Sequence, residues 1–209
     1  MTAKGPDQEG DDSGRLIPGS APPFNTGGGG FVIAKQAGAR ALLSLLSGIS
    51  LPGIDIGAIA TVRFQARGNG WLLDDLLVTS ESSGVTRRCS ISVKSGDEFG
   101  TSSAPASFVR LAWAQVLGIE PTLATFNEPQ DLLCLACPSP ETELKRHLTE
   151  LIAKATAQTP EQLEQHMHSE DVAALAKELY RSFRCPDDIA RGKASDQLFP
   201  GRLLRLLRF

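Results

Sequence analysis

WLLDDLLVTSESSGVTRRCSISVK, residues 71–94, is the most informative part of the sequence for the fold. Two runs rich in apolar and β-branched residues, 71–81 and 86–95, flank Ser82-Ser83-Gly84, a combination typical of a turn. This pattern predicts an antiparallel hairpin. An earlier run, 60–67, alternates apolar and polar residues in the way of a half-buried strand. Together the three runs predict a three-stranded β-meander.

Helical patterns surround the meander. Residues 31–47 precede it and are expected to form a helix with one apolar stripe: Ala34, Ala37, Gly38, Ala41, Leu42, Leu45 and Leu46. Further helices are expected over 104–117, 141–157 and 160–184, the last with a break within 166–171. The apolar run 131–137 is typical of a buried strand. The order predicts an α/β fold, in which a central mixed sheet, the three-stranded meander plus a further strand, is flanked by helices.

Composition narrows the class of protein. The chain has 209 residues, of which 41% are hydrophobic and 22% charged, which excludes collagen-like, mucin-like and wholly disordered chains. The net charge of −3 excludes a protein that coats nucleic acid by charge alone, so contact with nucleic acid would be local, metal-assisted or shared with a partner. No run of about 18 apolar residues and no export signal is present, so we expect no membrane partner and a cytoplasmic location with reduced cysteines.

Three regions are expected along the chain. Residues 1–25 are rich in Gly, Pro, Asp and Ser and predict a disordered leader. Residues 26–185 hold the regular pattern and predict the folded domain. Residues 186–209 form a C-terminal tail whose end, RLLRLLRF, is basic and amphipathic. We expect its leucines to dock on a partner subunit or on this domain.

Two adjacent acids and a lysine interrupt the apolar hairpin. Buried acids are costly unless they are paired or bind a metal. If the turn is centred between residues 83 and 84, paired residue numbers sum to 167, so Asp75 faces Ser92 and Leu73 faces Lys94. Asp75, Ser92 and Lys94 then share one face of the sheet, and Asp74 points to the other. A turn with an odd number of residues would favour Asp74 instead.

A carboxylate and a lysine on one sheet face suit metal-assisted hydrolysis of a phosphodiester. Mg²⁺, or Mn²⁺ in its place, prefers oxygen ligands, which the carboxylate and a backbone carbonyl supply. The metal activates water, and the lysine places a positive charge beside the phosphate. The alternative is a structural ion pair within the sheet.

Several of these pieces resemble a known family. They are the helix GGGGFVIAKQAGARALLSLL, the strand DDLLV, the run ISVKS, a helix with Trp113 and the strand that begins at Asp131. Residues 24–185 resemble the PD-(D/E)XK nuclease superfamily. More narrowly, they resemble the N-terminal double-stranded-DNA endonuclease domain of bacterial anti-phage effectors of the CBASS and STAND NTPase systems. The resemblance implies a restriction-endonuclease-like sandwich that cleaves DNA with Mg²⁺.

The resemblance also assigns roles to residues. Asp75 matches the metal-binding acid and Lys94 the catalytic lysine, with the Val93 carbonyl as a further metal ligand. Ser92 falls where the family carries Glu or Gln, so it would hydrogen-bond a metal-bound water. The accessory candidates are Gln36 and Gln65, which lie where many members of the superfamily carry a further acid, together with Asp74 and with Glu98 just beyond the lysine.

Two questions follow from the resemblance. One active site cuts one DNA strand, so we expect a homo-oligomer or a larger sensor or NTPase subunit as partner. The serine at position 92 and the glutamines at the accessory positions favour a rival function. In this alternative the chain is a catalytically degenerate nuclease fold that binds nucleic acid or a partner protein.

Overall fold

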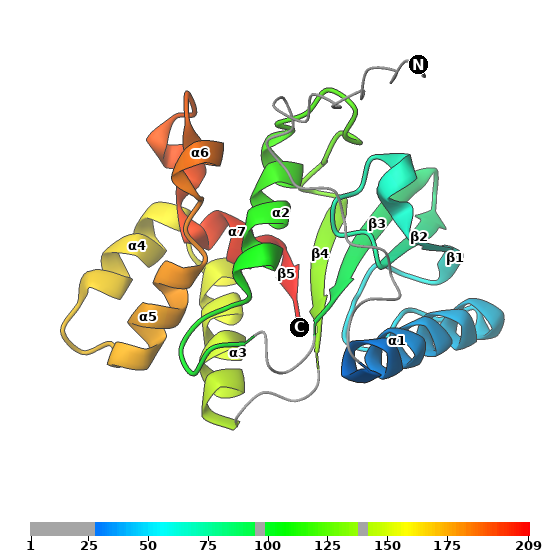
Figure 1. Cartoon of the computed structure of the whole chain (residues 1–209), viewed down its shortest axis with the longest axis horizontal. Coiled ribbons are helices and arrows are strands. Elements are labelled where there is room, and N and C mark those ends of the chain that lie inside the picture. Colours follow the sequence, from blue (N-terminus) through cyan, green and yellow to red (C-terminus); the bar gives the residue numbers. More distant parts are fainter. Residues whose placement is uncertain (1–27, 95–98, 138–141) are drawn as a thin grey trace, which may run out of the picture.

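The computed structural model describes residues 28–94, 99–137 and 142–209, so the expected leader and Glu98 lie outside the described residues. Within them a five-stranded mixed sheet runs in the order β1-β2-β3-β4-β5 (Figure 1). The strands are β1 Ile59–Phe64, β2 Leu76–Ser82, β3 Val85–Val93, β4 Asp131–Ala136 and β5 Leu207–Arg208. The first three form an antiparallel meander, while β4 lies parallel to β3 and β5 parallel to β4. The predicted α/β class and mixed sheet are confirmed, and β5 was not predicted.

The hairpin between β2 and β3 has the predicted register. Ser82 pairs with Val85 and Leu76 with Ile91, so every pair sums to 167. Ser83 and Gly84 both adopt positive φ, 51° and 78°. A two-residue loop of this kind matches the right-handed twist of the strands, which fixes the register.

Helices cover both faces of the sheet (Figure 1). Helix α1, Gly28–Ser47, packs on one face, against an apolar cluster that includes Val78, Cys89 and Ile91. The remaining helices belong to the other side and to the lobe beyond it: α2 Ala106–Leu117, α3 Thr142–Ala157, α4 Pro160–His168, α5 Ala174–Ser182, α6 Asp187–Ala190 and α7 Pro200–Leu206. The expected break within 160–184 separates α4 from α5.

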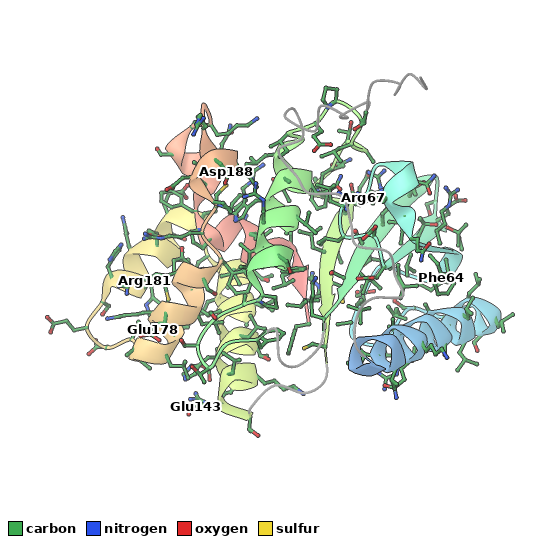
Figure 2. All side chains as sticks on the ribbon, viewed as in Figure 1. Phe64, Arg67, Glu143, Glu178, Arg181 and Asp188 are labelled. Carbon is green, nitrogen blue, oxygen red and sulfur yellow. The ribbon has the colours of Figure 1, made fainter. Side chains whose placement is uncertain are left out.

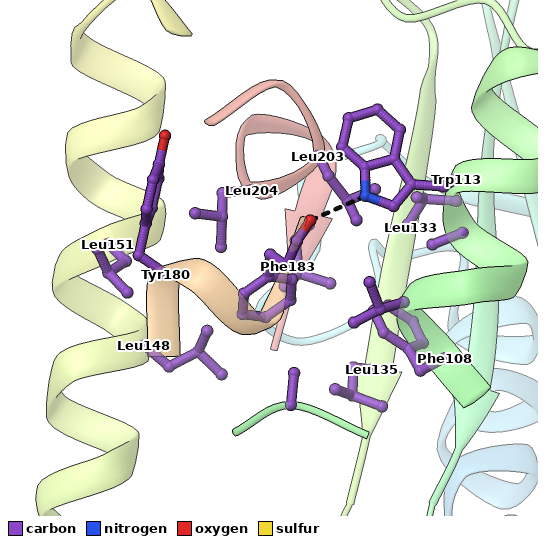
Figure 3. Packing of buried hydrophobic residues seen from close by; sticks show 14 of the residues in the cluster. Phe108, Trp113, Leu133, Leu135, Leu148, Leu151, Tyr180, Phe183, Leu203 and Leu204 are labelled. Carbon is purple, nitrogen blue, oxygen red and sulfur yellow. Dashed lines mark hydrogen bonds between the residues drawn. The ribbon is translucent and has the colours of Figure 1, made fainter. Parts of the chain in front are cut away.

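The larger core lies between the sheet and helices α2, α3, α5 and α7 (Figure 3). Trp113 of α2 is fully buried, and its indole Nε1 donates to the Phe183 carbonyl at 2.8 Å. Leu203, Leu204 and Leu207 are also fully buried in this core. Of the two docking places expected for the C-terminal leucines, the structure therefore shows this domain, and α7 and β5 complete it.

The first helix forms as predicted, but its apolar stripe is not buried as a whole, because Leu42 and Leu46 of α1 are exposed. The small residues face the sheet instead: Gly38 and Ala41 are buried. The ring of Phe64 lies so close to Gly38 that an added Cβ would meet it at 2.8 Å (Figure 2). Because this close approach needs small side chains, the leucines turn outward.

Candidate functional site

The two acids lie directly before β2 rather than in the middle of a strand, so that prediction was wrong. Residues 71–73 are buried and leave the ladder: Leu72 and Leu73 pack in the larger core, and Trp71 packs in a small separate cluster. The buried Gln115 of α2 accepts a hydrogen bond from the Leu72 backbone N–H at 2.8 Å. The predicted pairing of Leu73 with Lys94 gives way to a hydrogen bond from Ser90 Oγ to the Leu73 carbonyl at 2.5 Å. The segment thus turns back over β3 just before the acids.

Asp75 and Ser92 are brought together as the register predicted. Asp75 Oδ2 accepts a hydrogen bond from the Val93 backbone N–H at 2.7 Å. Ser92 Oγ donates to the same oxygen over a longer 3.4 Å. One carboxylate oxygen is therefore held at the end of β3, and Oδ1 is the oxygen with which Asp75 would bind a cation.

Lys94 follows β3 directly, and its backbone N–H donates to the Ala136 carbonyl of β4 at 2.8 Å. Its ammonium group interacts electrostatically with both acids. Asp74 and Asp75 thus both lie within the electrostatic reach of the same lysine. The arrangement joins two carboxylates and one cation at adjoining ends of β2 and β3.

Burial dominates the electrostatics of both acids. It raises the pKa of Asp75, and the Asp74 charge raises it further, while the Val93 N–H, Lys94 and Ser92 oppose the rise. Burial also raises the pKa of Asp74, against the effects of its own backbone N–H, Arg67 and Lys94. The pair is thus costly to ionise without a bound cation, a property that clusters at functional sites.

The two accessory glutamines lie at different places. Gln65 directly follows β1 and lies beside the acids, since its backbone N–H donates to the Asp75 carbonyl at 3.3 Å. Its φ of 53° is left-handed and strained for a residue with a side chain. Such strain persists where the surrounding structure imposes it, which is common at functional sites.

Gln36 lines an open groove of about 870 Å³ between α1 and the ends of β3 and β4. Ala136, which accepts the Lys94 N–H, belongs to the same lining. Arg40 and Lys145 add positive charge to this groove. Gln36 therefore lines the groove next to the end of β3, and it places an amide there rather than a carboxylate.

Sequence reasoning missed Gln115 and Arg67. Gln115 is fully buried, and besides holding Leu72 it donates to the Ala124 carbonyl at 2.9 Å. Its signal was a lone amide in the apolar sequence of α2. Arg67 lies in the short 3-10 helix Ala66–Asn69 after β1 and lowers the pKa of Asp74. Arg67 lies in the connection between β1 and β2, and nothing in the sequence pattern there indicates that it would approach the acids.

Comparison with known proteins gives no identification. The chain matches no family model, no curated protein and no solved structure. In the described part of the chain, none of the helices is both long and apolar enough to cross a membrane. The same residues contain no group of three or more His, Cys, Asp or Glu side chains that could hold a metal. The acids, Lys94 and their neighbours therefore carry the functional argument.

Proposed function

We propose that this chain is a metal-dependent DNA endonuclease that hydrolyses phosphodiester bonds, in bacterial anti-phage defence as its resemblance implies. The observation that carries the proposal is the pair of hydrogen bonds that holds Asp75 at the end of β3, with Asp74 directly before β2 and Lys94 directly after β3. Two partly buried carboxylates of raised pKa beside a lysine suit a site for a divalent cation and a phosphate.

The residues at this place fit Mg²⁺ or Mn²⁺. Mg²⁺ keeps several waters and needs only one or two protein carboxylates, so a cluster of three acids is not required. Asp75 Oδ1 and the Val93 carbonyl would hold the ion, with Asp74 as the second acid. A bound ion would supply an activated water and neutralise charge on the phosphate.

The chain's own residues have distinct tasks in this proposal. The Val93 N–H and Ser92 Oγ orient the Asp75 carboxylate through Oδ2. Lys94 places its charge beside the phosphate oxygens, where negative charge grows during attack. Gln115 holds residue 72 and so positions the segment that carries the acids.

The test is cleavage of supercoiled plasmid with Mg²⁺ or Mn²⁺, with EDTA to remove the metal. We expect Asp75→Asn and Lys94→Met to abolish cleavage. Asp55→Asn is the matched control, because Asp55 is an exposed acid in the loop before β1. Cleavage by Asp75→Asn at the wild-type rate would refute the proposal.

One observation supports the rival function, a degenerate fold that binds without cutting. Ser92 stands where the resemblance has Glu or Gln, and its hydroxyl is a weak, uncharged ligand. If the fold is degenerate, the wild type should bind DNA in a gel-shift assay with and without metal and cut none. Binding without cleavage therefore favours the rival, whereas metal-dependent cleavage excludes it.

A further inference from the structure

Helix α1 presents large apolar side chains to solvent. The α1 outer stripe consists of Val32, Leu42, Leu43, Leu46 and Ile49, the last just beyond the helix end. Leu46 is 83% exposed and Leu43 63% exposed. Among the described residues, α1 contacts mainly β1 and β3 on its inner side, and it lies at the periphery of the molecule (Figure 1).

The stripe is comparable in size to the largest apolar patch of a typical monomer. Its members expose on the order of 500 Å² of surface, and patches of that size are often functional in soluble proteins; a standard interface buries ~800 Å² on each partner. Phe64 of the neighbouring strand β1 is also exposed, although its ring packs on Gly38 at the inner side of α1. Strand β1 is an edge of the sheet.

The spacing of the stripe fits a second helix. Four of its residues, Val32, Leu42, Leu46 and Ile49, form a series with the exposed Ala39 in which the intervals are seven, three, four and three residues, while Leu43 flanks this series. Alternating intervals of three and four are those of a seam along which two helices pair. Such a seam is self-complementary, because the same residues of an identical helix can fill it.

The charges of α1 favour an antiparallel pair. Between residues 32 and 49 the charged residues are Lys35 and Arg40, both basic and both in the N-terminal half. Parallel pairing would bring like charges together. Antiparallel pairing places Lys35 beside the neutral C-terminal end of the other copy, where carbonyl groups favour cations, whereas Arg40 lies near the middle of the pair in either orientation.

We propose that the α1 outer stripe is the interface at which two copies of this chain form a symmetric dimer. The inference is independent of the nuclease chemistry, and its test measures mass rather than cleavage. If both proposals hold, the dimer brings two candidate sites to one DNA, which cleavage of both strands needs.

The experiment is size-exclusion chromatography with light scattering on the full chain at 5–100 µM protein. We expect the wild type at twice 22.3 kDa. We expect Leu46→Glu to raise the dimer dissociation constant by about 30-fold or more, as for a central interface residue. Ala153→Glu on the exposed face of α3 is the matched control and should remain dimeric.

Circular dichroism checks that the variants fold, and Leu46→Gln replaces Leu46→Glu if the charge prevents folding. A wild type that is monomeric at 100 µM would overturn the proposal, as would a dimer that Leu46→Glu and Leu46→Gln leave equally tight. Sedimentation of the wild type with phosphatidylglycerol vesicles, lost in Leu46→Glu, would assign the stripe to a membrane surface and also overturn it.

Discussion

The ion pair between Arg88 and Asp131 allows a sharp stability prediction. Arg88 Nε donates to Asp131 Oδ1 at 2.7 Å and its terminal nitrogen to Oδ2 at 2.6 Å. Asp131 is fully buried, whereas the Arg88 side chain is 27% exposed. Asp131 also accepts the Asn127 N–H at 2.7 Å, and the guanidinium lies 4.9 Å from the centre of the Trp71 ring. This pair begins the register between β3 and β4.

The two partners differ in what their loss leaves behind. Arg88→Ala strands a buried carboxylate, so we expect a loss of about 3–5 kcal/mol in the free energy of unfolding. At about 2–4 °C per kcal/mol for a chain of this size, the melting temperature should fall by roughly 6–20 °C. Asp131→Asn leaves an arginine that reaches water and still bonds the Thr125 carbonyl, so its loss should be about 1–2 kcal/mol.

Thermal and urea unfolding followed by circular dichroism measure both losses. The double variant Arg88→Met with Asp131→Leu should be more stable than Arg88→Ala, because it leaves no buried charge. Arg110→Ala is the control, since Arg110 pairs with Asp188 at the surface and its removal should hardly change the melting temperature. A loss for Asp131→Asn equal to or above that for Arg88→Ala would refute the reasoning.

Three further predictions concern the acids, a turn and a helix start. Asp75→Asn should raise stability at neutral pH, because burial raises the pKa of Asp75 and the ionised form therefore destabilises the fold. This gain in stability should be present at neutral pH and vanish in acid, where the Asp75 carboxyl is protonated. In a separate measurement, Mg²⁺ should raise the melting temperature of the wild type and not of Asp75→Asn. Gly70→Ala should lower stability by about 1–3 kcal/mol in urea unfolding, because φ is +81° there and a Cβ would strike the Ala124 backbone nitrogen. Thr159→Ala should cost about 1 kcal/mol in the same assay, since Thr159 and Gln162 form a capping box at the start of α4.

The hairpin shows what the sequence can predict about this fold. Ser83 and Gly84 form a two-residue loop, and the parity of that loop alone brings Asp75 opposite Ser92. The exit of residues 71–73 from the ladder could not be predicted, because it depends on Gln115, more than 40 residues away. The sequence around the turn therefore predicts the pairing register of β2 and β3, whereas the residue at which β2 begins depends on tertiary contacts.

The first helix and the chain end show a second limit. Helix α1 has apolar residues on both faces, so periodicity could not choose which face is buried. The choice depends on the Phe64 ring beside Gly38. The C-terminal leucines likewise form an amphipathic pattern that does not indicate where they dock. In the structure they dock in the core beside Leu133.

At the candidate site the fold adopts several features that local stability disfavours, and all of them lower the stability of the chain. Two adjacent acids are partly buried, each with a raised pKa, and Gln65 beside them holds a left-handed backbone. Each feature lowers the stability of the chain by itself. A bound divalent cation would reverse the penalty of the acids, since it favours their ionised forms. Without a cation, the ionised acids therefore lower the stability of the fold, and a bound cation would restore it. For this reason, stability measured with and without Mg²⁺ tests the site before any cleavage is measured.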